Sequence, residues 1–190
     1  MTTILLFHHA LGQTEGFLAF AEELRKAGHT VHTPDLYEGN VFQDLDEGVG
    51  FAKKTGFGEI MNRGAAAAEG LPADVVTAGF SLGVMPAQAF TQTRPGARGA
   101  LFYHGCLPPS EFESPWPDGV PLQAHFMELD PWADEDLPVA RDLVASLADG
   151  ELFVYPGSGH LFADSTSADY DEKSAALLME RTLAFLERVG

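Results

Sequence analysis

The five residues Gly79-Phe80-Ser81-Leu82-Gly83 match the pattern G-x-S-x-G, which places a serine at a sharp turn from a strand into a helix. The flanking glycines remove side chains that would collide with the neighbouring strand and helix. The turn strains the middle residue and holds its hydroxyl above the sheet, at a helix N-terminus that favours developing negative charge. The pattern therefore predicts that Ser81 is a nucleophile for acyl transfer.

A serine hydroxyl is a weak nucleophile, so it needs a base within hydrogen-bond reach and an acid that orients the base. With this type of turn the order along the chain is nucleophile, acid, base. Asp130 follows directly on the strand expected to end near Met127–Leu129, and His160 lies in a Gly-rich loop just after the strand expected at 152–155. Both side chains should emerge at the same sheet edge as Ser81, which predicts a catalytic triad of these three residues.

Other residues compete for two of these roles. Glu128, Asp134 and Asp136 are alternative acids, but the first lies within the strand pattern and the other two fall in the helix expected next. Of the seven histidines, only His160 follows a late strand in a Gly-rich loop, whereas His125 is expected in the core.

Acyl transfer also needs hydrogen-bond donors for the oxyanion that forms on the attacked carbonyl. One donor should be the backbone N–H of Leu82, the residue after the nucleophile. The second should come from the loop 8–12 after the first strand, where Ala10 is preferred and Leu11 is a close alternative. The side chain of His9 is a further candidate in this loop, although a solvated or structural role is favoured for it.

The loops around the predicted triad supply candidate substrate contacts, because apolar and aromatic side chains suit a hydrophobic acyl or alcohol group. The selected residues are His9, Leu11, Phe80, His104 and Trp132. Further apolar side chains in the same loops fit core or loop packing equally well. Cys106, the single cysteine, is predicted to be a buried, inert thiol.

The chain alternates strand-like and helix-like segments from end to end, which predicts an α/β fold with a mostly parallel sheet and helices on both faces. Residues 1–190 are expected to form a single domain. The region 36–58 is rich in Gly and acidic residues and is expected to mix loop and short helix. The strands are predicted at 4–7, 30–33, 75–78, 100–103, 123–127 and 152–155, and the helices at 14–27, around 65–68, 82–92, 134–148 and 174–188.

The composition argues against several classes of function. The formal net charge of −17 argues against binding of nucleic acid, whose phosphates would be repelled, and no polybasic patch is present to bind anionic lipid. The sequence has no transmembrane-length apolar run and no recognisable signal peptide, so a cytoplasmic location is expected. One cysteine excludes an internal disulfide.

Taken together, these residues resemble the dienelactone hydrolase family of α/β-hydrolases over essentially the whole chain. The resemblance rests on Pro34-Asp35-Leu36-Tyr37, the turn at Ser81, Asp130, Gly159-His160-x-Phe162 and the C-terminal run 175–186. It implies a short sheet with an unlidded cleft, a nucleophile–His–Asp triad, and no metal or organic cofactor.

Two departures from the family pattern concern the chemistry. The best-known members have a cysteine where this chain has Ser81, and a glutamate in the loop after the first strand where this chain has His9. Those members also bind a substrate carboxylate through an arginine shortly after the catalytic histidine, and the matching residue here is Asp164. A carboxylate there would repel an anionic lactone, so a neutral substrate is expected.

The leading hypothesis is a serine hydrolase that cleaves a small ester or lactone through an acyl-enzyme on Ser81. A thioesterase or acyltransferase with the same triad is an alternative, and a non-catalytic ligand-binding protein that keeps the hydrolase fold is a different class. A metal-dependent hydrolase is disfavoured, because no H-x-H or H-E-x-x-H spacing occurs.

Overall fold

The computed structural model describes all of residues 1–190 and has a six-stranded sheet at its centre. The strands lie in the order β2-β1-β3-β4-β5-β6, and every neighbouring pair is parallel. Their bounds are β1 (Thr3–Phe7), β2 (Thr30–His32), β3 (Val76–Phe80), β4 (Gly99–Tyr103), β5 (Leu122–Met127) and β6 (Gly150–Tyr155). The prediction of an α/β fold is thus confirmed, with a sheet that is entirely parallel.

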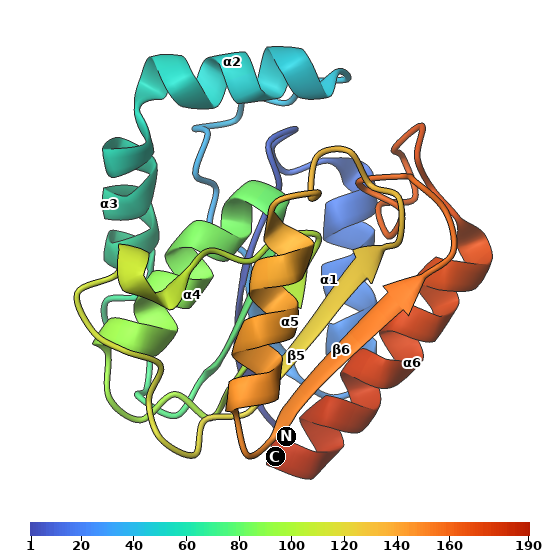
Figure 1. Cartoon of the computed structure of the whole chain (residues 1–190). Helices are drawn as coiled ribbons and strands as arrows, with labels where there is room; N and C mark the ends of the chain where they lie inside the picture. Colours follow the sequence, from blue (N-terminus) through green and yellow to red (C-terminus); the bar gives the residue numbers. More distant parts are fainter.

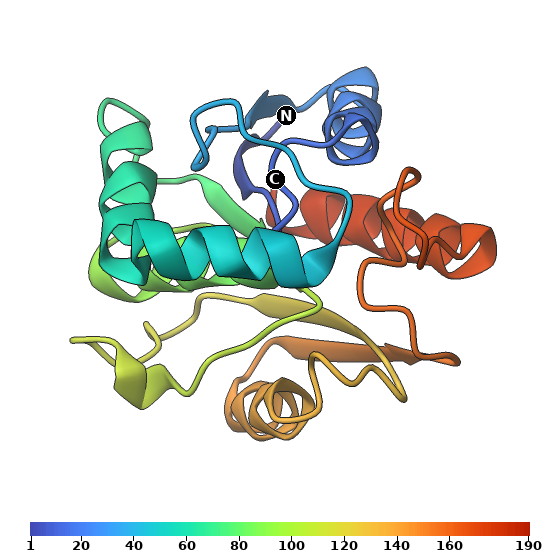
Figure 2. The ribbon, with the colours of Figure 1, turned by 90° about the horizontal axis from the view of Figure 1, so that it is seen from above.

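Helices cover both faces of the sheet (Figures 1 and 2). One face is covered by α1 (Glu15–Lys26) and α6 (Glu172–Val189), and the other by α3 (Phe57–Ala67), α4 (Val84–Thr93) and α5 (Asp136–Ser146). The helix α2 (Leu45–Thr55) lies across the edge where the strands end (Figure 1). Two short 3-10 segments, Ser81–Gly83 and Pro109–Glu111, complete the secondary structure.

Alternating side chains along each strand supply the two halves of the core. In β1, Ile4 and Leu6 pack into the apolar cluster beneath α1 and α6, whereas Leu5 and Phe7 pack into the cluster beneath α2 to α5. Successive side chains of a strand point to opposite faces, so a strand covered on both sides must be apolar throughout. This explains the continuous apolar runs from which the strands were predicted.

The region 36–58 is more regular than the sequence predicted, because α2 occupies residues 45–55 within it. Asp44 caps this helix by accepting a hydrogen bond from the Glu47 amide. Gly48 allows the helix to approach the loop after β1, since a side chain there would overlap the carbonyl oxygen of Ala10. Gly48 is therefore a close-contact residue rather than a helix breaker, whereas Gly56, with φ of 92°, separates α2 from α3.

None of these helices combines the length and the apolar character that crossing a membrane requires.

Candidate active site

The nucleophile turn connects β3 to α4 at the centre of the sheet. Ser81 has φ of 49°, in the left-handed region that is strained for a residue other than glycine. A side chain at position 79 would overlap the carbonyl of Gly83, and one at position 83 would come within 2.5 Å of the Phe7 carbonyl oxygen. Both glycines are therefore required by backbone contacts on the two sides of Ser81.

Ser81, His160 and Asp130 form one chain of hydrogen bonds. Ser81 Oγ lies 2.7 Å from His160 Nε2, and His160 Nδ1 lies 2.6 Å from Asp130 Oδ2. An ionised carboxylate only accepts hydrogen bonds, so the neutral imidazole donates from Nδ1 to Asp130 and accepts the Ser81 hydroxyl at Nε2. This is the orientation in which the imidazole can take a proton from the serine.

The fold brings the three groups together because they follow β3, β5 and β6 at the same sheet edge. Asp130 Oδ1 accepts a hydrogen bond from the Trp132 amide at 2.9 Å, which fixes the carboxylate behind the imidazole. The backbone N–H of His160 donates to Asp169 Oδ2 at 3.1 Å. The Asp169 contact was missed in the sequence, because an irregular loop between β6 and α6 gives no periodic signal.

The two candidates for the second oxyanion donor, the backbone N–H groups of Ala10 and Leu11, differ in their hydrogen bonds. The Leu11 N–H donates to His9 Nδ1 at 3.3 Å. Ala10 is only 2% exposed, and its backbone N–H has no hydrogen-bond acceptor within the protein. The Ala10 N–H thus has no partner in the protein, whereas the Leu11 N–H is already engaged.

Hydrogen bonds also connect this loop to the segments around it. His8 Nδ1 donates to the His9 carbonyl at 2.8 Å, and His8 Nε2 accepts the Leu36 N–H at 2.9 Å. Burial lowers the pKa of His8 to about 4, so the ring stays neutral and keeps both contacts near pH 7. The Phe42 amide donates to the Leu11 carbonyl at 2.9 Å, which ties the loop to the segment before α2.

The structure corrects the expectation for Asp164. This carboxylate is 1% exposed and does not face a substrate cleft; Asp164 Oδ2 lies 2.8 Å from Nε2 of the fully buried His9. Burial alone would raise the pKa of Asp164, but hydrogen bonds from His9, Thr14 and Thr166 outweigh burial and hold it well below its usual value. The predicted repulsion of an anionic substrate by Asp164 therefore does not follow.

Four of the five candidate substrate contacts are buried, since Leu11 is also only 5% exposed. His9, as described, has no exposed surface, and Phe80 packs in the core against Phe17, Phe20 and Tyr103, because it occupies a strand position that faces α1 and α6. The ring of His104, at the end of β4, lies within aromatic contact of Phe80, His160 and Phe162. Burial holds the pKa of His104 well below its usual value.

Two candidates, Leu11 and Trp132, line a hollow of about 300 Å³ that contains no member of the triad but includes Asp169, the acceptor of the His160 N–H. The Trp132 ring is 45% exposed and its centroid lies 6.1 Å from that of His160. The residues lining this hollow include three aspartates and no lysine or arginine: Leu11, Gln43, Asp44, Leu45, Asp46, Trp132, Ser167, Ala168 and Asp169.

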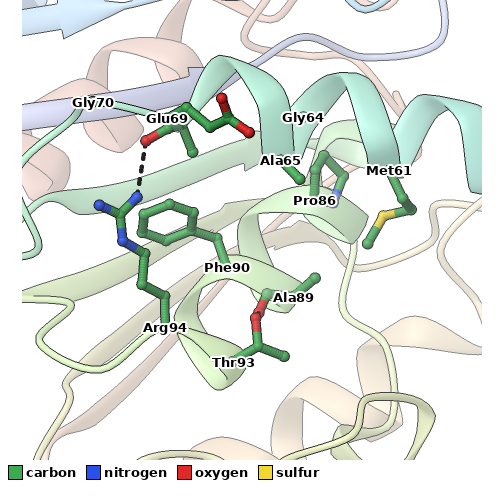
Figure 3. Close-up of a pocket in the computed structure, with 11 residues that line it drawn as sticks. Met61, Gly64, Ala65, Glu69, Gly70, Pro86, Ala89, Phe90, Thr93 and Arg94 are labelled. Carbon is green, nitrogen blue, oxygen red and sulfur yellow. Dashed lines mark hydrogen bonds between the residues drawn. The ribbon is translucent and has the colours of Figure 1, made fainter.

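A second hollow, of about 390 Å³, lies between α3 and α4 and contains no member of the triad (Figure 3). Its one cationic side chain, Arg94, donates to the carbonyls of Ala68 and Leu71 and lies over the ring of Phe90. Arg94 is thus engaged at the end of α3 and is not free to bind a substrate group.

The alternative acid Asp136 and the cysteine contact each other, whereas the other two alternative acids, Glu128 and Asp134, are exposed. Asp136, at the start of α5, accepts the Cys106 N–H at 3.1 Å, and burial raises its pKa. Cys106 is fully buried as predicted, and burial, with the nearby charge of Asp136, raises its pKa to about 12.

His125 is a core histidine as predicted, held by Gln123 and Tyr155. No group of three or more His, Cys, Asp or Glu side chains is arranged to hold a metal ion.

Several solved structures share this fold. A dienelactone hydrolase from Anabaena variabilis matches with a TM-score of 0.68 and 20% identity, covering 98% of this chain and 86% of that one. A dienelactone hydrolase-like promiscuous phosphotriesterase from metagenomic libraries matches with a TM-score of 0.73 and 15% identity, covering 100% and 87%. Esterase 2 from Thermogutta terrifontis, with propionate bound, matches with a TM-score of 0.63 and 15% identity, covering 100% and 84%.

A search of curated proteins found no matching relative. The family model of the dienelactone hydrolase family, by contrast, matches residues 1–190. This match spans the β3–α4 turn and the loops after β5 and β6, as the resemblance in the sequence implied. The chain belongs to the dienelactone hydrolase family within the α/β-hydrolase fold.

Proposed function

We propose that this protein is a serine hydrolase that cleaves a small, uncharged ester or lactone through an acyl-enzyme on Ser81. The observation that carries the proposal is the continuous hydrogen-bonded chain from Ser81 through His160 to Asp130. A nucleophile, a base in the matching tautomer and an acid behind the base are the groups that acyl transfer requires.

In the first half-reaction, Ser81 Oγ attacks the substrate carbonyl carbon while His160 Nε2 takes the hydroxyl proton. Negative charge then develops on the carbonyl oxygen, where the backbone N–H groups of Leu82 and Ala10 stabilise it. As the tetrahedral intermediate collapses, the imidazolium of His160 gives its proton to the leaving alkoxide. The products are the alcohol and an ester of the acyl group with Ser81.

In the second half-reaction, water replaces the alcohol. His160 removes a proton from water as the oxygen attacks the acyl carbon, and the same two amides bind the new oxyanion. Collapse breaks the bond to Ser81 Oγ, which regains its proton from His160. Asp130 stays ionised throughout and stabilises the imidazolium in both half-reactions.

The lining of the hollow supports an uncharged substrate. Asp44, Asp46 and Asp169 would repel a carboxylate there, and no cation is present to bind one. The exposed face of Trp132 offers an apolar contact to the acyl or alcohol group. The propionate bound to the Thermogutta terrifontis esterase supports short acyl chains as the first substrates to examine.

The test is the hydrolysis of p-nitrophenyl acetate and butyrate, a neutral lactone and an acetyl thioester by wild type and Ser81→Ala. We expect Ser81→Ala to lose at least about 10⁴-fold in kcat/KM with an unchanged circular dichroism spectrum. Ser110→Ala is the matched control, because this serine is exposed and lies in the 3-10 segment Pro109–Glu111, outside the proposed triad. Turnover retained in Ser81→Ala would refute the proposal.

A further inference from the structure

A second buried histidine–carboxylate pair, His9 and Asp164, lies beside the proposed active site. The two side chains are 0% and 1% exposed, and His9 Nε2 lies 2.8 Å from Asp164 Oδ2. We infer that His9, oriented by Asp164, is a positioning residue that sets the backbone of the loop 8–12 and so aims the Ala10 amide at the oxyanion. This inference rests on the proposed function, because it concerns the donors of that reaction.

The contacts of the His9 ring fix its tautomer. Nε2 faces a carboxylate, which can only accept, so Nε2 carries a hydrogen. Nδ1 faces the Leu11 N–H at 3.3 Å, so Nδ1 must be the acceptor. A protonated ring would set an N–H against the Leu11 N–H. The geometry therefore requires neutral His9 with its hydrogen on Nε2.

This tautomer determines which amide is available to a substrate. The ring accepts the Leu11 N–H and so engages that amide, whereas the Ala10 N–H has no acceptor in the protein. Adjacent peptide groups share a backbone, so an acceptor for one amide constrains the direction of its neighbour. Removal of one oxyanion donor typically costs about 10²–10³ in kcat, and small misplacements are also costly.

Asp164 is held as firmly as His9. Its Oδ2 also accepts from the Thr14 hydroxyl at 2.5 Å, and its Oδ1 accepts from the amide and hydroxyl of Thr166 at 2.8 and 2.7 Å. Thr14 caps α1, and Asp164 lies four positions after His160. The pair thus connects the oxyanion loop to the loop that carries the proposed base, and fixes the two sides of the site relative to each other.

Two substitutions separate the two contacts of His9. In His9→Asn, the side-chain oxygen can replace Nδ1 and still accept the Leu11 N–H, but the contact with Asp164 is lost. In His9→Gln, the side-chain nitrogen can replace Nε2 and still donate to Asp164, but the acceptor for Leu11 is lost. His125→Gln is the control, because His125 is equally buried and makes two hydrogen bonds away from Ser81.

The readouts are kcat and KM for p-nitrophenyl acetate and the melting temperature of each variant. We expect His9→Gln to lower kcat by about 10- to 100-fold with a nearly unchanged KM and the smaller loss of melting temperature. His9→Asn should show the opposite order, with a larger loss of melting temperature and a smaller loss of kcat. His125→Gln should lower the melting temperature and leave kcat within about twofold.

A kcat that follows the melting temperature across all three variants would overturn the inference, because the pair would then only stabilise the fold. Loss of turnover in Ser81→Ala alongside unchanged kcat in His9→Gln would refute the role of His9 and leave the proposed function standing. The tautomer is tested without activity by ¹⁵N NMR of the wild-type imidazoles. Nδ1 of His9 should be unprotonated near pH 7, and a proton found on Nδ1 would contradict the inference.

Discussion

Two buried pairs of the same residue types, His160–Asp130 and His9–Asp164, lie at the carboxyl edge of the sheet. In both, one ring nitrogen lies within 2.8 Å of a carboxylate oxygen. The second nitrogen of His160 faces the Ser81 hydroxyl, whereas that of His9 faces the Leu11 backbone amide. The Ser81 hydroxyl can lose its proton as its oxygen bonds to a substrate carbonyl carbon, whereas the backbone amide forms no such bond. Proton transfer in the proposed reaction is therefore expected only at the first pair.

The carboxylates also use opposite ring nitrogens. Asp130 binds Nδ1 and leaves Nε2 as the acceptor, whereas Asp164 binds Nε2 and leaves Nδ1 as the acceptor. In each pair the carboxylate selects the tautomer, and the group facing the other nitrogen decides the role. A histidine–aspartate pair therefore indicates a proton-transfer site only when its free nitrogen faces a group that can lose or gain a proton.

The largest expected effect comes from removal of the base. His160→Ala should lower kcat for p-nitrophenyl acetate by about 10⁶-fold, because Ser81 then has no group to accept its proton. The corresponding change in the other pair, His9→Ala, should lower kcat far less while costing more stability. Comparable losses of kcat in the two variants would remove the distinction between the pairs.

Asp130→Asn comes next, with an expected loss of about 10⁴-fold in kcat. An amide at this position can donate to Nδ1, which favours the wrong tautomer and places a hydrogen on Nε2 facing Ser81. The rate should be measured from pH 6 to 10, since a rise in kcat at high pH would show that His160 can still accept a proton. A loss below tenfold throughout would show that His160 does not need the carboxylate.

Asp164→Asn tests the carboxylate of the His9–Asp164 pair. The new NH₂ group would face donors, so we expect the free energy of unfolding to fall by about 1–3 kcal/mol, as urea denaturation would measure. The loss in kcat should be only about tenfold, because the triad itself is intact. If kcat fell as far as in Asp130→Asn, Asp164 would have to act on the triad directly.

The smallest effect concerns stability in acid. The pKa of Asp164 is lowered in the folded protein, so its contribution to stability is present above the unfolded value near 4 and is lost as the pH falls toward the lower folded value. The wild type should therefore lose more unfolding free energy than Asp164→Asn between pH 5 and 2. If urea denaturation showed the same loss of unfolding free energy in wild type and Asp164→Asn over this pH range, the assignment would be contradicted.

The residues of the triad could be predicted because their signals are local: a five-residue turn, and two loops that directly follow apolar strands. The sheet was predictable for the same reason, since strands buried on both faces are apolar throughout. The structure then adds the distances that join residues 79 and 30 positions apart, Ser81 with His160 and Asp130 with His160. No spacing rule in the sequence supplies those distances.

Other features depend on contacts that no short pattern records. His9 and Asp164 are 155 positions apart, and both lie in irregular loops. Phe80 lies beside the nucleophile in the sequence, but the alternation of β3 turns its ring into the core. Gly48 lies inside α2, where its missing side chain makes room for the Ala10 carbonyl, and no short pattern in the sequence records that contact.

The most direct test of the account is covalent labelling of the nucleophile. Wild type, His160→Ala and His9→Gln should be treated with a fluorophosphonate at pH 7.5, and the modified peptide identified by mass spectrometry over time. The account predicts a single adduct on Ser81, formed rapidly in wild type, more slowly in His9→Gln and by far the slowest in His160→Ala. An adduct on another residue, or equal rates of labelling in wild type and His160→Ala, would contradict it.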